Sequence, residues 1–234
     1  MTTIDVVLPV YNEERVLAQS VATLRQFLKE NLTHPFRIVI ADNASTDKTW
    51  ELAQALSQQH SDVICLHLDQ KGRGRALRHA WLNSSANIVS YMDVDLSTSL
   101  EAFPRLIQTI EAGYDVAVGS RLLPGSSVKR CLRRELASRS YNFLIKAMFL
   151  AKLSDAQCGF KALKREAAQE LVPLIQDQGW FFDTELLILA HKKGYRIKEI
   201  PVAWVEGSDS KVSITKTALE ELKGLLRMRF RPLP

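Results

Sequence analysis

The chain has 234 residues, of which 46% are hydrophobic and 24% are charged. This balance excludes a disordered chain and suits one large α/β domain or two small ones. The net charge is +5, and basic residues concentrate in 129–139 and 216–231, which predicts an anionic partner. Three scattered cysteines predict a reduced compartment. We expect no signal peptide, and no membrane span either, because no run of about 18 apolar residues is present.

The first half of the chain alternates between short apolar runs and segments with helical spacing of apolar residues. The predicted strands are 4–10, 36–41, 63–68, 87–92 and 114–119, and the predicted helices are 16–28, 50–56, 76–83 and 100–111. Such alternation predicts a largely parallel sheet that is covered on both faces.

The second half is less regular. Pro, Gly and paired Ser in 121–129 predict a loop, and 207–211 predict a flexible polar loop before a terminal helix. A strand that contains Pro201 is predicted to lie at an edge, because proline cannot donate to the hydrogen-bond ladder. The remaining predicted elements are a strand-like segment at 155–164 and helices at 133–150, 164–171 and 183–193.

The predicted strand at 87–92 runs directly into two carboxylates, Asp93 and Asp95. Residues two apart in an extended segment point the same way, so both carboxylates can face one cation while Val94 points back into the protein. Ligands in open α/β sheets bind beyond the carboxyl ends of the strands. Two carboxylates there suit Mg²⁺ or Mn²⁺. The alternative is an acidic turn that caps the next helix.

Several motifs follow one another in a fixed order along the chain. The first five are Pro9-Val10-Tyr11-Asn12-Glu13, Asp42-Asn43-Ala44-Ser45-Thr46-Asp47, Lys71-Gly72-Arg73-Gly74, Asp93-Val94-Asp95-Leu96-Ser97 and Gly119-Ser120-Arg121. They resemble the nucleotide-sugar half of the inverting glycosyltransferases of family 2. Three later motifs resemble the dolichyl-phosphate mannosyltransferase and polyprenyl-phosphate glycosyltransferase branch of that family: residues 155–161, 180–185 and 210–212.

The resemblance implies an α/β fold: one GT-A-like domain over 1–234, with a mostly parallel central sheet flanked by helices. Its parts would be a Rossmann-like nucleotide-sugar half (1–121), an acceptor half (122–215) and a basic amphipathic C-terminal helix (216–234). The implied enzyme is a hexosyltransferase that moves mannose or glucose from a GDP or UDP donor to dolichyl or polyprenyl phosphate, with inversion and a divalent metal, Mg²⁺ or Mn²⁺. The chain departs from the family pattern at Asn43, where a second acid is usual, and at Ser97, where an amide can occur.

The resemblance implies donor-binding roles for Pro9, Tyr11, Glu13, Asp42, Lys71, Gly72, Asp93, Val94, Gln157 and Lys211. Asp42 would accept an N–H of the nucleobase, and Lys71 or Arg73 would neutralise the diphosphate. The alternatives are a helix N-cap for Asp42 and an ordinary basic turn around Lys71. The glycine motif lacks the Walker and dinucleotide-binding patterns, which excludes a typical kinase or dehydrogenase.

The acceptor side would need groups that position a phosphate. The implied catalytic residues are Asp95, Asp155, Arg121 and Arg134, and the implied metal ligands are Asp93 and Asp95. The acceptor phosphate would be bound by Arg121, Arg134 and Ser138. The sugar side would be lined by Trp180, Asp183 and Glu185. A phosphate monoester is mostly dianionic at neutral pH, so Asp155 acts either as a base or only as an orienting group. The arginines supply planar forks for phosphate oxygens. The alternatives are a solvated charge run for Arg134 and core packing for Trp180.

Two segments combine basic residues with apolar faces, 130–150 and 219–230. They predict peripheral contact with a membrane, on its cytosolic face, although a buried core helix is the alternative for the first. Relatives often continue into transmembrane helices, and three alternatives stay open: a membrane-anchoring partner subunit, a membrane part outside this sequence, and an enzyme that needs none. The basic clusters lack a nucleic-acid recognition motif, and we expect no nucleic-acid partner. Two alternative functions stay open: a family 2 enzyme with a soluble or saccharide acceptor, and a non-catalytic nucleotide-sugar-binding subunit.

Overall fold

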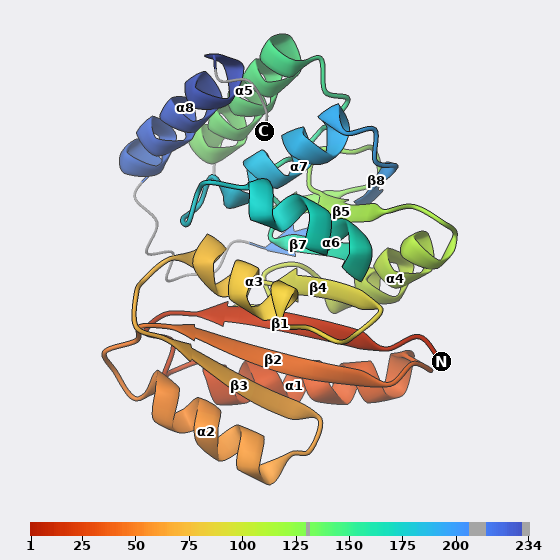
Figure 1. The fold of residues 1–234 in the computed structure, drawn as a ribbon, viewed down its shortest axis with the longest axis vertical. Helices are drawn as coiled ribbons and strands as arrows, with labels where there is room; N and C mark the ends of the chain where they lie inside the picture. Colours follow the sequence, from red (N-terminus) through yellow and green to blue (C-terminus); the bar gives the residue numbers. More distant parts are fainter. Residues whose placement is uncertain (130–131, 206–213, 231–234) are drawn as a thin grey trace.

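The computed structural model describes residues 1–129, 132–205 and 214–230. Seven strands form one sheet in the order β3-β2-β1-β4-β7-β5-β8 (Figure 1). They are β1 (Ile4–Val10), β2 (Phe36–Asn43), β3 (Val63–Leu68), β4 (Ile88–Met92), β5 (Val116–Ser120), β7 (Phe160–Lys164) and β8 (Ile197–Pro201). Only β7 runs antiparallel to its neighbours among these strands, which confirms the mostly parallel sheet. The predicted edge position of Pro201 is also confirmed, because β8 is the last strand.

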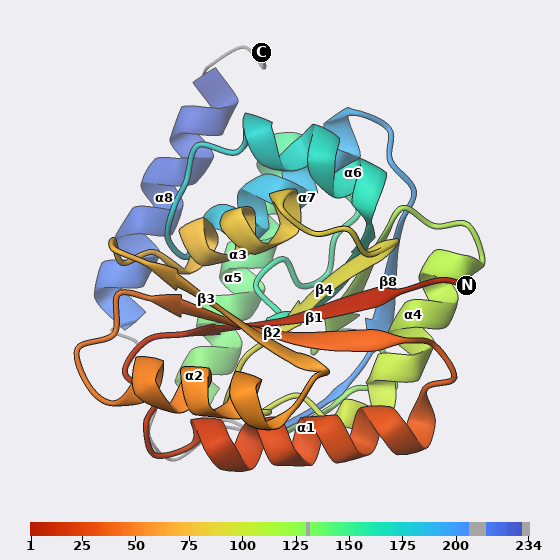
Figure 2. The same cartoon turned by 60° about the horizontal axis from the view of Figure 1, so that its bottom comes forward.

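Helices cover both faces of the sheet (Figure 2). On one face lie α1 (Leu17–Asn31), α2 (Thr49–Gln59) and α4 (Phe103–Glu111), the last preceded by the short helix η1 (Leu100–Ala102). On the other lie α3 (Arg73–Leu82), α6 (Arg165–Leu171) with η2 (Val172–Leu174), and α7 (Phe182–Lys192). Each face has its own apolar core: Val7 of β1 belongs to one, and Val6 and Leu8 belong to the other. Burial on both faces explains why this strand is apolar throughout.

Three local predictions differ from the structure. Helix α3 begins at Arg73, not at Ala76, so Gly74 lies in its first turn, where a Cβ would come within 2.6 Å of the Phe182 Cβ. The predicted loop at 121–129 ends in β6 (Ser127–Lys129), which pairs with β9 (Ala203–Val205) in a second small sheet. In the segment 155–164, only β7 is a strand. The predicted loop at 207–211 lies outside the described residues.

Two further helices, α5 (Leu132–Phe149) and α8 (Ile214–Phe230), pack side by side at one end of the sheet (Figure 1). Gly224 lets α8 approach α7 closely, since a Cβ there would come within 2.5 Å of the Phe181 ring. Arg227 of α8 also binds Glu185 of α7 at 2.6 Å. Within the described ranges, no helix has the length and hydrophobicity needed to cross a bilayer.

The third attachment of α8 is a buried carboxylate, Glu221, which is only 2% exposed. The Tyr141 hydroxyl of α5 donates to one of its oxygens, and the Gln157 amide donates to the other at 3.3 Å. Burial raises the pKa of Glu221 to about 7. A carboxyl group therefore titrates near neutrality where α8 joins the rest of the domain.

Replacing Glu221 by glutamine should remove this titration. The pKa of Glu221 rises from 4.5 to about 7 on folding, so the free energy of unfolding of the wild type should fall as the pH rises through this window. The expected fall is of the order of 1–3 kcal/mol in chemical denaturation, and it should be smaller in Glu221→Gln. Glu220→Gln, at an exposed position of the same helix, is the control and should behave like the wild type. Equal pH profiles for wild type and Glu221→Gln would contradict the prediction.

Candidate active site

A buried chain of charged side chains lies beneath the carboxyl end of β4. The Arg73 guanidinium donates to Asp93 at 2.8 Å and, with its other amino group, to Asp183. Asp183 in turn accepts from the Lys161 ammonium at 2.8 Å and from the Tyr91 hydroxyl. Lys161 is fully buried, and its remaining donors bind backbone carbonyls. Residues from α3, β4, β7 and α7 are joined in this way, and Asp93 is the member that reaches the surface.

Asp183 is therefore an internal counter-ion. Burial alone would raise its pKa, but Lys161 and Arg73 together hold the pKa of Asp183 below its usual value. Both of its oxygens bind protein groups within the described structure. Trp180, predicted with Asp183 on the sugar side, lies at the surface: it is 43% exposed, with its ring 5.1 Å from the Arg73 guanidinium.

The two predicted metal ligands lie at the mouth of this network. The Asp93 side chain is 43% exposed and Asp95 is exposed, whereas Val94 between them is buried, as the alternation predicts. Asp95 also accepts the Ser97 amide at 3.0 Å, so it closes the acidic turn as well. Gly159 lies directly against Asp93: a Cβ there would come within 1.9 Å of its Oδ2. The absence of a side chain at 159 thus leaves room for this carboxylate.

The pair fits a divalent cation with few protein ligands. In the described part of the chain, no three His, Cys, Asp or Glu side chains converge to hold a metal. Asp93 and Asp95 would supply two oxygens, and the other positions would fall to water and diphosphate oxygens. Mg²⁺ and Mn²⁺ are commonly bound in this way.

Asp42 and Asn43 end β2 in different roles. Asp42 is fully buried, with one oxygen 2.7 Å from His67 Nδ1 and the other without a partner among the described residues. Asn43 ties neighbouring loops together, because its amide donates to the Val10 carbonyl at 2.5 Å and accepts the Gly72 amide at 3.0 Å. Hence the departure at Asn43 has a structural role. The N-cap alternative for Asp42 is wrong, since the amide of Thr49 at the start of α2 binds Asp47.

The other predicted donor residues lie around the ends of β1 and α3. The Lys71 ammonium lies 3.5 Å from the centre of the Tyr11 ring, so two residues predicted in the donor site meet in space. Pro9 is within β1, opposite Ala41. The backbone amide of Glu13 donates to the Thr49 hydroxyl at 2.8 Å, which fixes the loop that carries Tyr11. Gly72 abuts the carbonyl of Gln178, which a Cβ would approach to 2.6 Å.

In the region predicted to bind the acceptor, Asp155 and Arg121 form a buried two-pronged ion pair. Arg121 donates from Nε and a terminal nitrogen at 2.7 and 2.9 Å, and its backbone amide adds a third bond at 3.0 Å. Burial would raise the pKa of Asp155, but Arg121 outweighs it and holds the pKa below its usual value. A fully buried carboxylate with both oxygens engaged favours the orienting role over the role of a base. Trp204 stacks on the same guanidinium at 5.6 Å.

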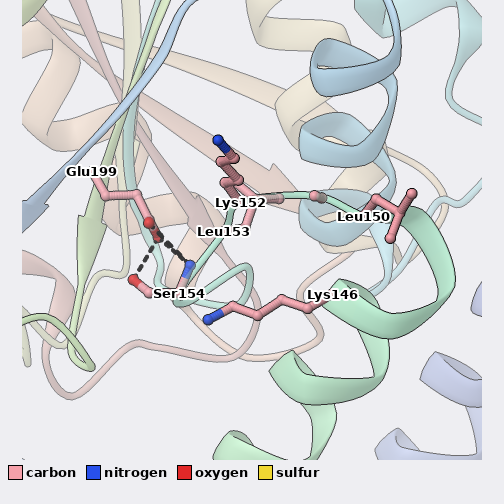
Figure 3. A pocket seen from close by; sticks show the side chains of 7 residues that line it. Lys146, Leu150, Lys152, Leu153, Ser154 and Glu199 are labelled. Atoms are coloured by element: carbon pink, nitrogen blue, oxygen red, sulfur yellow. Dashed lines mark hydrogen bonds between the residues drawn. The ribbon is translucent and has the colours of Figure 1, made fainter.

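Glu199 of β8 supports this ion pair from behind. Its carboxylate accepts the amides of Ser154 and Asp155 at 2.8 and 3.0 Å, and the Ser154 hydroxyl at 2.7 Å. It borders a hollow of about 430 Å³ with Lys146 and Lys152 on its rim (Figure 3). The loop that carries Asp155 is thus fixed by a strand far from it in the sequence.

Some predicted site residues serve other contacts or cannot be placed. Gln157 binds Glu221 and Glu185 binds Arg227, so both contact α8. Ser138 has a buried hydroxyl without a partner among the described residues. Arg134 lies in α5, but its side chain is outside the described residues, as is all of Lys211.

Sequence reasoning missed several residues that shape the site. Tyr91, His67 and Glu199 carried no local signal. Lys161 did carry one, because a lysine inside the apolar run of β7 is rare unless a counter-ion is buried with it.

Comparison with known proteins agrees with this geometry. The model of the family described as "Glycosyl transferase family 2" matches residues 5–172. Glycosyltransferase AglD of Haloferax volcanii is 35% identical over 96% of this chain, which spans only 36% of AglD. The dolichyl-phosphate beta-glucosyltransferase of Dictyostelium discoideum is 29% identical, with 98% of this chain and 75% of the relative covered. The corresponding protein of Saccharomyces cerevisiae is 28% identical, with 97% and 74% covered.

Solved structures show the same fold. Glucosyl-3-phosphoglycerate synthase from Mycobacterium tuberculosis, in complex with Mn²⁺, UDP and glucosyl-3-phosphoglycerate, matches with a TM-score of 0.73 at 19% identity. The match covers 99% of this chain and 81% of that one. The expected GT-A-like fold is therefore confirmed, and so is the resemblance drawn from the motifs. The chain belongs to glycosyl transferase family 2 and is a glycosyltransferase.

Proposed function

We propose that the protein transfers one hexose from a nucleoside diphosphate donor to a polyprenyl or dolichyl phosphate. The observation that carries this proposal is the pair of accessible carboxylates after β4, Asp93 and Asp95, together with a fixed cation after β5, Arg121; β4 and β5 end on either side of the start of β7. Burial would lower the pKa of Arg121, but Asp155 and, more weakly, Asp93 raise it, so Asp93 lies within electrostatic reach. A metal-bound diphosphate and an acceptor phosphate can thus be held side by side. The names of the relatives support the lipid phosphate acceptor.

For the donor we propose UDP-glucose. The named relatives from Dictyostelium and yeast are glucosyltransferases, and the structure with a TM-score of 0.73 contains UDP. Asp42, at the end of β2, offers a buried carboxylate oxygen for an N–H of the base. GDP-mannose is the alternative donor.

The proposed chemistry is one in-line displacement with inversion. The acceptor phosphate, already mostly dianionic at neutral pH, attacks the anomeric carbon as the bond to the diphosphate breaks. No enzyme nucleophile is needed. Asp155 orients Arg121, whose remaining N–H donors bind the acceptor phosphate. The bound phosphate can then approach the anomeric carbon from one direction only. When bound at Asp93 and Asp95, a divalent cation would stabilise the charge of the departing nucleoside diphosphate.

The outer face of α5 and α8 supports peripheral contact with an anionic membrane. On α5, Leu136 and Phe143 lie two turns apart and are each 69% exposed, and Leu150, directly after the helix, is 81% exposed. The exposed large apolar residues of α8 are Leu219, Leu222, Leu226 and Phe230. Exposed basic residues lie among these: Arg139, Lys146, Lys223 and Arg229. This composition is typical of helices at a lipid surface. We propose the cytosolic face of the membrane as the site of action, with a membrane-anchoring partner subunit as a further possibility to test.

The transfer itself can be tested with radiolabelled UDP-glucose and GDP-mannose, each offered with polyprenyl phosphate, Mn²⁺ or Mg²⁺, and detergent. We expect label to enter the organic phase from UDP-glucose, since the product carries the sugar on a lipid. A soluble phosphate monoester in place of the lipid is the control and should keep the label in water. Transfer only to the soluble acceptor would support the soluble-acceptor alternative. Donor binding without any transfer would indicate a non-catalytic subunit.

Gly159→Ala tests the metal pair without altering a carboxylate. The new Cβ would meet Asp93 Oδ2 at 1.9 Å, so Asp93 must rotate away. We expect the Mn²⁺-dependent affinity for UDP to fall by about tenfold or more in calorimetry, while the protein remains folded. Gly179→Ala, whose nearest neighbour would be Asp177 Oδ1 at 3.5 Å, is the matched control. Unchanged Mn²⁺ dependence in Gly159→Ala would remove the proposed role of Asp93.

Flotation with anionic vesicles tests the membrane face. We expect the wild type to float with the vesicles at low salt and to be released at high salt. Phe143→Ser and Lys146→Glu should each lower the partition coefficient by about fivefold or more. Lys48→Glu, at an exposed position beside α2 on the opposite side of the molecule, should not (Figure 1). A wild type that stays with the aqueous fraction at low salt would refute this part of the proposal.

A further inference from the structure

The carboxylate proposed to bind the nucleobase has only one oxygen available. Asp42 and His67 are directly opposite each other on the paired strands β2 and β3. His67 Nδ1 lies 2.7 Å from Asp42 Oδ2. Because a carboxylate only accepts hydrogen bonds, the ring nitrogen is the donor. Asp42 Oδ1 is buried and has no partner in the described part of the chain.

His67 is held in this orientation from two sides. Its ring packs on Trp50 of α2, with 4.9 Å between centroids and 41° between planes. Its second nitrogen, Nε2, lies 3.8 Å from Asp69 Oδ1. The bond to Asp42 is therefore a fixed feature of the strand ends. Asp42 cannot turn Oδ2 outward without breaking its bond to the histidine.

The number of free oxygens matters because nucleobases differ in the donors they present. Uracil presents one N–H, at N3, between two carbonyl groups. Guanine presents two neighbouring donors, at N1 and the 2-amino group, which match both oxygens of an unoccupied carboxylate. With Oδ2 occupied, Asp42 matches the single donor of uracil, and a guanine would leave one donor unpaired in a buried place, which is unfavourable.

We propose that His67 is a specificity-determining residue of the donor site. By occupying Oδ2 of Asp42, it leaves one buried acceptor and selects a base with a single N–H over guanine. This inference rests on the proposed function, because it assumes that Asp42 faces the donor base.

The test measures the affinities of wild type, His67→Ala and His67→Asn for UDP, GDP and IDP with Mn²⁺ by calorimetry. The wild type should prefer UDP to GDP. In His67→Ala both oxygens of Asp42 are free, so the ratio of GDP to UDP affinity should rise by about tenfold. IDP has the N1 donor but no 2-amino group, so its affinity should not follow that of GDP. His67→Asn restores an N–H near Oδ2 and should restore the wild-type ratio.

The outcomes separate failure of the inference from failure of the proposed donor. A wild type that binds UDP, with an unchanged GDP to UDP ratio in His67→Ala, overturns the role of His67 alone. Equal gains in affinity for GDP and IDP also overturn that role, since removal of the histidine would then act by making space for a purine base. A wild type that binds neither nucleotide, or prefers GDP, overturns the proposed donor together with the inference. His60→Ala, at the far end of α2, controls for loss of a histidine, and thermal unfolding confirms that each variant is folded.

Discussion

The site depends on the burial of one positive charge, that of Lys161. A lysine without contact with water is stable only beside a counter-ion and a full set of acceptors, and Asp183 and two backbone carbonyls supply them. Asp183 in turn holds Arg73, and Arg73 holds Asp93. Helices α3 and α7 and strands β4 and β7 therefore have to pack together before Asp93 can lie at the surface in a fixed orientation. The close approach of Gly74 to Phe182 and of Gly159 to Asp93 makes that packing sterically possible.

Paired side chains also occur at two other predicted site positions. Asp155 is matched by Arg121 and Asp42 by His67, and in each pair the partner comes from a different part of the chain. Fixed pairs of this kind orient the groups before a ligand arrives, which is how enzymes stabilise developing charge without reorganising. Asp93 and Asp95, which stay accessible at the surface, are suited to a cation, and a cation bound there would attract a diphosphate.

Helix α8 connects the outer surface to this interior. Leu219, Leu222, Leu226 and Phe230 are exposed on it, Leu225 and Met228 are buried in the core, and Glu221, Gly224 and Arg227 attach it to α5 and α7. Two of these contacts, to Phe181 and Glu185, flank Asp183 in the sequence. The helix that carries part of the surface proposed to meet lipid is thus packed against the segment that holds the buried charges. Gln157, predicted in the donor site, and Glu185, predicted on the sugar side, both contact α8.

Local periodicity and the chemistry of proline were enough to predict the alternating strands and helices, the edge position of Pro201 and the outward direction of Asp93 and Asp95. The sequence by itself did not determine the start of α3, since glycines disfavour helix and only packing on Phe182 and Gln178 overrides them. Nor did it determine which charges pair. Arg73 and Asp183 are 110 residues apart, and Arg121 and Asp155 are 34 apart. Which charges pair depends on the tertiary structure. In the unfolded chain water screens the charges from one another, and folding removes this water from the buried pairs.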